Sequence, residues 1–141
     1  MHELTSISPI VDALSEEWFE ASSNGQFLLQ RCRDCGHIQY YPRRHCTVCM
    51  AEDPEWITST GNGTLYSFSV VYKTPTAEFV ADVPYALAIV KLDEGVFVTS
   101  RVVDTPFEDL RCDLRVKAVF PKVRANQVTL PLFVRSNEES A

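Results

Sequence analysis

Two Cys-x-x-Cys pairs constrain this chain more than any other feature. Cys32 and Cys35 form the first pair, Cys46 and Cys49 form the second, and ten residues separate them. Each pair can place two thiolates on one tight turn, and two such turns can close on Zn²⁺ with zinc–sulfur distances of about 2.3 Å. The spacing therefore predicts one tetrahedral metal site on a small β-ribbon.

Other uses of the four cysteines carry less weight. Residues 1–10 contain no basic segment leading into an apolar one, which argues against secretion and therefore against disulfides. Iron bound as in rubredoxin uses the same ligand set and stays open, although zinc is the expected ion. Because protein would fill all four positions, the metal has no open site for substrate, and its expected role is structural.

Length and composition point to one modest core beside this ribbon. The chain has 141 residues, of which 45% are hydrophobic. No stretch approaches the roughly 18 apolar residues of a membrane span, so we expect a soluble, cytoplasmic protein without a membrane partner. The formal net charge of −6 argues against a general nucleic-acid surface.

Basic residues nevertheless gather around the cysteines. Residues 31–45 include four arginines and one aspartate, which gives this segment a net charge of +3. Among them, Arg43 and Arg44 are candidates for contacting a phosphate group or an acidic partner. The alternative is that they are solvated surface side chains.

An amphipathic helix is predicted for residues 8–24. Ser8 and Pro9 suit its first positions, apolar residues up to Trp18 recur at helical spacing, and Asn24-Gly25 ends it. The apolar stripe with Trp18 either binds a partner or packs against this chain's own ribbon or barrel, and the sequence leaves both open.

The remainder predicts a mainly β protein. The zinc ribbon should span residues 25–60, with strands at 27–31 and 38–41, and residues 55–58 should lead out of it toward a turn at 61–63. An OB-type barrel should span 61–135, with strands at 63–73, 85–92, 96–103, 115–122 and 128–134 and a short helical connection at 105–110. Alternation in the first barrel strand places Tyr66, Phe68 and Tyr72 on one face, and the second strand is apolar on both faces. Residues 136–141 are expected to be a disordered tail.

Several motifs together resemble one family. They are Gly25-Gln26-Phe27-Leu28-Leu29-Gln30-Arg31-Cys32, Cys35-Gly36, Tyr41-Pro42-Arg43, Gly63-Thr64-Leu65-Tyr66-Ser67-Phe68, Val83-Pro84-Tyr85 and Leu92-Asp93-Glu94-Gly95. With the preceding helix they are similar to the bacterial and archaeal "domain of unknown function thirty-five" family, over about residues 11–134. One departure is Met50, which stands where many relatives have glycine after the fourth cysteine.

The resemblance implies a rubredoxin-like zinc ribbon joined to an OB-fold, in a small subunit that associates with thiolase-fold enzymes. Such subunits support thiolases, acyltransferases, hydratases or steroid side-chain aldolases without supplying the catalytic residues. The implied arrangement is a hetero-oligomer in which the ribbon and helix dock on the larger subunit. Contact of the OB-fold with acyl-coenzyme A (acyl-CoA) is also implied. Arg43 and Arg44 are then the candidates for the charged contact with the larger subunit or with the phosphates of CoA.

A search for catalytic residues agrees with an accessory role. His2 lies near the terminus, and His37 and His45 lie beside metal ligands. The fifth cysteine, Cys112, has no positioned histidine and is expected to be buried and inert. We therefore name no catalytic residue. The alternative function is binding of single-stranded nucleic acid, with Tyr66, Phe68 and Tyr72 as a stacking platform.

Overall fold

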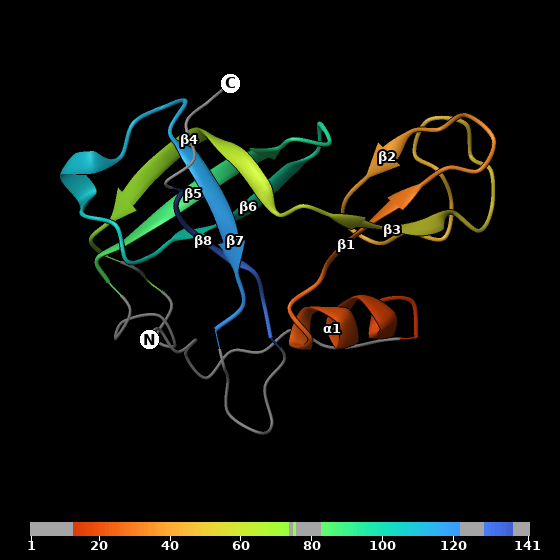
Figure 1. The fold of residues 1–141 in the computed structure, drawn as a ribbon, viewed down its shortest axis with the longest axis horizontal. Coiled ribbons are helices and arrows are strands. Elements are labelled where there is room, and N and C mark those ends of the chain that lie inside the picture. The colour runs from red at the N-terminus through yellow and green to blue at the C-terminus, as the bar shows by residue number, and fades with distance from the viewer. Residues whose placement is uncertain (1–12, 74, 76–82, 122–128, 137–141) are drawn as a thin grey trace.

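The computed structural model describes residues 13–73, 75, 83–121 and 129–136. A three-stranded ribbon lies to one side of a closed five-stranded barrel, and a helix lies below the place where the two meet (Figure 1). The mainly β architecture predicted from the sequence is confirmed. Within the described part of the chain, no helix is long and apolar enough to cross a membrane.

Helix α1 spans Glu16–Ser23. The predicted start at Ser8-Pro9 lies outside the described residues, but Ala13 to Ser15 form a turn, so a continuous helix through Ser15 is wrong. The first helical hydrogen bond runs from the Phe19 N–H to the Ser15 carbonyl, and two acidic side chains in the first turn favour a helix N-terminus there. Asn24-Gly25 ends the helix as predicted.

Trp18 belongs to the core. Its side chain is only 1% exposed, its indole N–H donates to the Leu28 carbonyl at 2.9 Å, and its ring meets the edges of Phe19 and Phe27. Of the two alternatives for the apolar stripe, the second therefore holds for Trp18: it packs against its own chain. Its assignment as a partner-binding residue is corrected, because a buried ring offers no surface to a partner.

The ribbon consists of β1 (Phe27–Arg31), β2 (Ile38–Gln39) and β3 (Glu55–Ser59), with β1 in the middle and antiparallel to both neighbours. The bounds of β1 match the prediction. The return strand is shorter than the predicted 38–41, because the chain leaves the sheet where Tyr40 turns to pack against Phe27 and Trp18.

The barrel contains β4 (Asn62–Val71), β5 (Tyr85–Leu92), β6 (Phe97–Val102), β7 (Arg115–Val119) and β8 (Leu132–Arg135). A short 3₁₀ turn, η2 (Phe107–Asp109), follows β6. The strand order is β4-β5-β6-β8-β7, and pairing of β7 with β4 closes the sheet. This is the order of an OB-fold. The tail predicted for 136–141 lies, apart from Ser136, outside the described residues.

A register shift in β4 overturns one predicted face. The pairing with β5 slips between Leu65 and Ser67, which inserts an extra residue on β4. As a result Leu65 and Phe68 both turn toward the core, whereas Tyr66 is 60% exposed on the outside. Tyr66, Phe68 and Tyr72 therefore do not share one face.

Strand β5 differs from its prediction in a related way. Its residues alternate between buried and outward positions, and the outward residues Leu87 and Ile89 are 40% and 38% exposed. The strand is apolar on both sides, as the sequence indicated, but only one side is buried. An apolar outer face of the barrel follows.

One continuous core joins the ribbon base to the barrel. The Phe27 ring of β1 lies 6.0 Å from Trp18 and 6.4 and 6.5 Å from Phe120 and Phe133 of the barrel, measured between ring centroids. At the chain crossing, the Ser59 hydroxyl donates to Glu94 Oε1 at 2.9 Å and the Thr60 N–H donates to Glu94 Oε2 at 3.0 Å. These contacts fix the base of the ribbon relative to the barrel.

Candidate metal centre and ribbon cleft

The four predicted cysteines come together at the far end of the ribbon. The Sγ atoms of Cys32, Cys35, Cys46 and Cys49 all lie within 4.8 Å of one another. Two of the separations are 3.4 Å, between Cys32 and Cys49, and 3.6 Å, between Cys35 and Cys46. A tetrahedral zinc–thiolate site requires sulfur–sulfur distances of roughly 3.8 Å, so the sulfur atoms fit one metal ion.

Each pair of cysteines lies on a turn with the same hydrogen bonds. In the first, the N–H of Cys32 donates to the His37 carbonyl and the N–H of Gly36 donates to the Cys32 carbonyl. In the second, the N–H of Cys46 donates to the Ala51 carbonyl and the N–H of Met50 donates to the Cys46 carbonyl. The two turns are therefore equivalent halves of one metal-binding ribbon.

Backbone N–H groups also prepare the first thiol of each turn for metal. The Cys35 and Asp34 N–H groups donate to Cys32 Sγ, and this lowers the pKa of Cys32 to about 6. The N–H groups of Cys49 and Val48 act in the same way on Cys46, whose pKa is also lowered. Cys32 is therefore a good thiolate ligand near neutral pH, and Cys46 ionises more readily than an ordinary thiol.

The second thiol of each turn behaves differently. The His37 N–H lowers the pKa of Cys35, but desolvation and the neighbouring thiols outweigh it, so that the pKa is raised. The Ala51 N–H likewise lowers the pKa of Cys49, while hydrogen bonding with Cys32 and desolvation raise it to about 12. A bound cation would displace these protons, because metal ligation requires thiolate.

Two buried glutamines hold the segment that leads into the second turn. Gln30 and Gln39 face each other on β1 and β2 and are 3% and 5% exposed. The Gln30 amide accepts from the Arg43 N–H at 2.8 Å and donates to the Arg43 carbonyl at 2.9 Å. Gln39 donates to Gln30 and to the His45 carbonyl, and accepts from the Thr47 N–H. Sequence reasoning missed this network, although two strand glutamines at ribbon positions were a usable signal.

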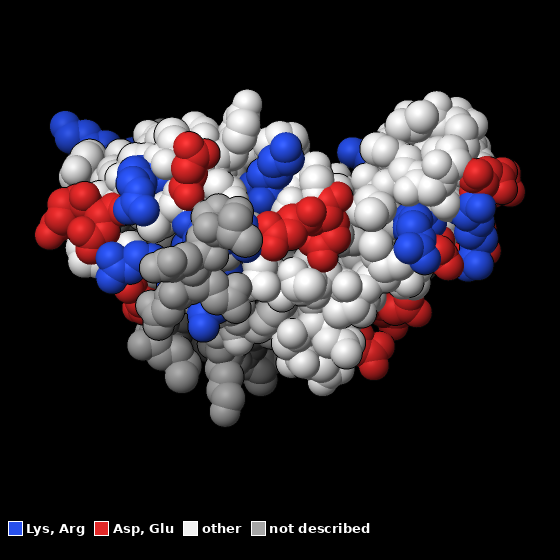
Figure 2. Space-filling view, turned by 45° about the horizontal axis from the view of Figure 1, so that its top comes forward, with Lys and Arg blue, Asp and Glu red and all other residues white. Residues whose placement is uncertain are grey.

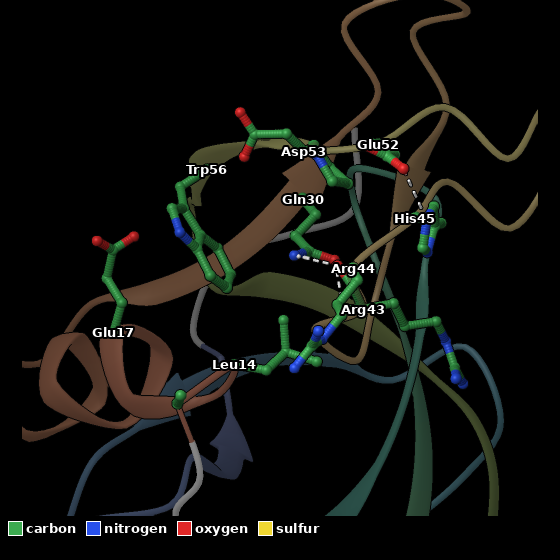
Figure 3. A pocket seen from close by; sticks show the side chains of 11 residues that line it. Leu14, Glu17, Gln30, Arg43, Arg44, His45, Glu52, Asp53 and Trp56 are labelled. Carbon is green, nitrogen blue, oxygen red and sulfur yellow. Dashed lines mark hydrogen bonds and ion pairs between the residues drawn. The ribbon is translucent and has the colours of Figure 1, made fainter.

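Arg43 and Arg44 line a cleft of about 500 Å³ between the start of α1 and the ribbon (Figure 3). Its other walls include Leu14, Glu17 and Trp56. A neighbouring hollow of about 360 Å³ shares both arginines and continues toward the second cysteine turn. The glutamine network fixes the backbone of Arg43, so the guanidinium groups extend from a rigid base.

Charges of both signs are mixed on the visible surface. Figure 2 shows Lys and Arg side chains interspersed with Asp and Glu over both the barrel and the ribbon, without one continuous basic track. The cleft itself also contains acidic side chains, and His45 lies 3.7 Å from Glu52 within it. Binding of single-stranded nucleic acid requires a positively charged groove beside stacking aromatics. The split of Tyr66 and Phe68 onto opposite faces removes the predicted platform as well.

Among the described residues, the candidate catalytic groups do not come together. His37 and His45 lie beside the metal ligands, as predicted, and His2 lies outside the described part. Cys112 is exposed, which corrects the expectation that it is buried. It lies in an exposed turn, where the neighbouring Leu110 and Leu114 supply the buried side chains instead. The arrangement can bind a structural metal and can offer the surfaces of the ribbon and the barrel to a partner. These features define a protein built from a metal-binding ribbon and an OB-type barrel.

Comparison with known proteins gives the family. The model of the ChsH2 rubredoxin-like zinc ribbon domain matches residues 19–55, and that of the ChsH2 C-terminal OB-fold domain matches residues 56–121. A DUF35 domain-containing scaffold protein of Methanocaldococcus jannaschii is 35% identical over 95 residues, which cover 67% of each protein. The chain therefore belongs to the DUF35 family, as its motifs indicated.

Two further relatives have names that state a role. The benzoylsuccinyl-CoA thiolase subunit BbsA of Geobacter metallireducens is 29% identical over 102 residues, which cover 72% of this chain and 66% of that subunit. A chain of the solved Ltp2-ChsH2(DUF35) aldolase is 26% identical and covers 90% of this chain and 98% of its own length, with a TM-score of 0.79. The likeness thus extends over the helix, the ribbon and the barrel.

Proposed function

We propose that this chain is a non-catalytic accessory subunit that binds and supports a thiolase-like enzyme acting on acyl-CoA thioesters. The observation that carries the proposal is the structural likeness to the DUF35 chain of the Ltp2-ChsH2 aldolase over 90% of the length. The relationship to a benzoylsuccinyl-CoA thiolase subunit supports the same class of partner. Among the described residues, His37 and His45 lie beside the metal ligands and Cys112 is exposed, which agrees with a chain whose partner performs the chemistry.

The resident metal in this proposal is Zn²⁺ with a structural role. Four thiolates at tetrahedral spacing suit zinc and leave no position for substrate. Elemental analysis of protein purified without added metal is expected to give one zinc per chain. A red protein containing iron in the same ratio would instead assign rubredoxin-like iron.

The ribbon cleft is the proposed site of the charged contact. Arg43 and Arg44 line both hollows and extend from a backbone that buried glutamines hold in place. Rigid guanidinium groups form strong paired hydrogen bonds with carboxylates or phosphates. They are therefore proposed to contact acidic side chains of the enzyme or the phosphates of CoA.

The test is to find the partner and then to rebuild the complex. A tagged copy of the chain is purified from its source organism, and the copurifying proteins are identified by mass spectrometry. The expected partner is a thiolase-like chain that, when coexpressed, forms a stable complex and turns over an acyl-CoA substrate that neither chain converts alone. A thiolase-like chain with full activity by itself and no binding to this chain would overturn the proposal.

A further inference from the structure

The outer face of β4, β5 and β6 carries apolar side chains that do not belong to the core. Tyr66 and Phe97 are 60% and 48% exposed, and Leu87 and Ile89 lie between them on β5. Strand pairing places Ile89 opposite Ser67 and Thr99. The four apolar residues therefore lie on one continuous sheet surface, which we call the barrel face.

The register shift in β4 contributes to this surface. Because the extra residue turns Tyr66 outward, its ring reaches Phe97 of β6, edge to face, with 5.0 Å between the centroids. The two strands are separated by β5, so the aromatic pair spans three strands. A bulge that brings large rings together in this way gives the face a fixed shape.

The charge of the barrel face is opposite to that of the chain as a whole. The strands β4, β5 and β6 contain Lys91 and Arg101 but no aspartate or glutamate, whereas the chain has a net charge of −6. Both cations lie over aromatic rings: Lys91 Nζ is 5.8 Å from the Phe97 centroid, and the Arg101 guanidinium is 3.9 Å from that of Tyr85. The face thus combines an apolar centre with positive charge.

We propose that the barrel face is a docking surface for the thiolase-like subunit, which covers it with an apolar patch bordered by carboxylates. This inference rests on the proposed function and adds a second contact, on the barrel, to the one at the ribbon cleft. Aromatic residues and arginine are the side chains that contribute most to protein interfaces. A carboxylate on the partner complements Lys91, and like charges disfavour wrong orientations.

Two other occupants fit the face less well. Two cations on three strands are too few for a single-stranded nucleic acid, whose backbone follows a continuous basic groove, and the aliphatic Leu87 and Ile89 offer no stacking surface. A second copy of this chain would bring Lys91 and Arg101 of both copies to one interface, where like charges oppose each other.

The test measures the affinity of the purified chain for the copurified and identified thiolase-like subunit. The double variant Ile89→Glu/Phe97→Glu is expected to bind at least about tenfold more weakly, and Lys91→Glu several-fold more weakly with a smaller dependence on salt. Lys117→Glu is the matched control, because it makes the same charge change on β7, at an exposed position on another side of the barrel. It is expected to bind like the wild type.

Thermal unfolding by circular dichroism checks that the variants are folded. If the wild type and the barrel-face variants bind the subunit equally, this inference fails while the proposed function stands. If the wild type itself forms no complex, both fail. The inference is also overturned if the chain alone is a dimer that the face variants dissociate, or if a labelled single-stranded oligonucleotide binds the wild type and not these variants.

Discussion

Gly36 and Met50 occupy equivalent positions in the two cysteine turns, and both have left-handed backbone conformations, with φ of +77° and +65°. Each follows the second cysteine of its pair, and each N–H donates to the carbonyl of the first cysteine. Glycine adopts this conformation without strain, whereas a residue with a side chain pays roughly 1–2 kcal/mol. The second turn therefore carries a backbone cost that the first avoids.

Replacing Met50 with glycine is expected to stabilise the ribbon. The Met50 side chain is 67% exposed, so few contacts are lost. Removal of the backbone strain is partly offset by the greater conformational entropy that glycine loses on folding. The free energy of unfolding should therefore rise by about 0.5–1 kcal/mol. Chemical denaturation of the metal-loaded protein measures the change. Gly36→Ala is the reciprocal variant and should destabilise by a similar amount. A destabilised Met50→Gly protein would show that this side chain makes contacts the isolated chain needs.

Metal removal is expected to open the far end of the ribbon and leave the barrel folded. A ribbon this short has too little core to persist alone, and structural zinc can contribute on the order of 10 kcal/mol. The chain has two tryptophans, Trp56 near the cysteine end of the ribbon and Trp18 in the core. A strong chelator should therefore shift fluorescence to the red through Trp56, while the far-ultraviolet circular dichroism of the barrel persists.

Two variants sharpen the metal experiment. In Trp56→Phe the chelator should produce almost no fluorescence change, because the remaining Trp18 stays buried against Leu28. Cys32→Ser should reproduce the chelated spectrum before any chelator is added and should lose the bound metal. Retention of one metal per chain by Cys32→Ser, or a complete loss of barrel structure on chelation, would contradict this division between ribbon and barrel.

Local sequence patterns predicted the elements whose structure depends on residues that are close together in the sequence. The cysteine spacing predicted the metal site, and apolar runs bounded by turn signals predicted the bounds of β1 and β5. The bulge at Tyr66 was not predictable in this way, because it depends on how β4 pairs with β5 and not on the alternation within β4. The start of α1 at Glu16 was missed because Ser8-Pro9 and Ser15, which is followed by two glutamates, both have features of a helix start, and local sequence does not rank them.

The glutamine network was missed for a different physical reason. A strand glutamine usually faces solvent, and only the loop after β2, which folds back over Gln30 and Gln39, makes their burial favourable. Tertiary packing likewise decides the surroundings of Arg43 and Arg44, whose common cleft is formed by α1 and β3 together. Sequence patterns identified these arginines by charge but could not place the walls around them.

Substitution of Gln39 by leucine is expected to loosen the second cysteine turn. The variant keeps a buried side chain of similar size but leaves the Thr47 N–H and the His45 carbonyl without their partner. Each unpaired buried group costs about 1–3 kcal/mol, so the metal should dissociate faster to a chromogenic chelator. Gln26→Leu, at an exposed position just before β1, is the control and should release metal at the wild-type rate. Equal rates for Gln39→Leu and the wild type would show that the metal alone holds this loop.

The ion pair between Arg115 and Asp93 should stop stabilising the barrel in acid. Arg115 on β7 donates to both carboxylate oxygens of Asp93, at 2.9 and 3.0 Å, and these contacts hold the Asp93 pKa below its usual value of 3.8. A lowered folded-state pKa means that the stabilisation is complete above the unfolded-state pKa and is lost as the pH falls through the folded-state value. Because Asp93 is 46% exposed, solvent screening limits it to a few tenths of a kcal/mol, up to about 1.

Urea denaturation of the wild type and Asp93→Asn at several pH values tests this contribution. At pH near 6 the variant should unfold at a lower urea concentration than the wild type. The gap should close as the pH falls through the lowered folded-state pKa of Asp93, where its carboxylate becomes protonated. Glu108→Gln, an exposed carboxylate in η2, is the control and should show no such convergence. A gap that is constant across this range would mean that Asp93 stabilises the β5–β6 turn through its hydrogen-bonding shape, because a contribution from charge must vanish when the charge does.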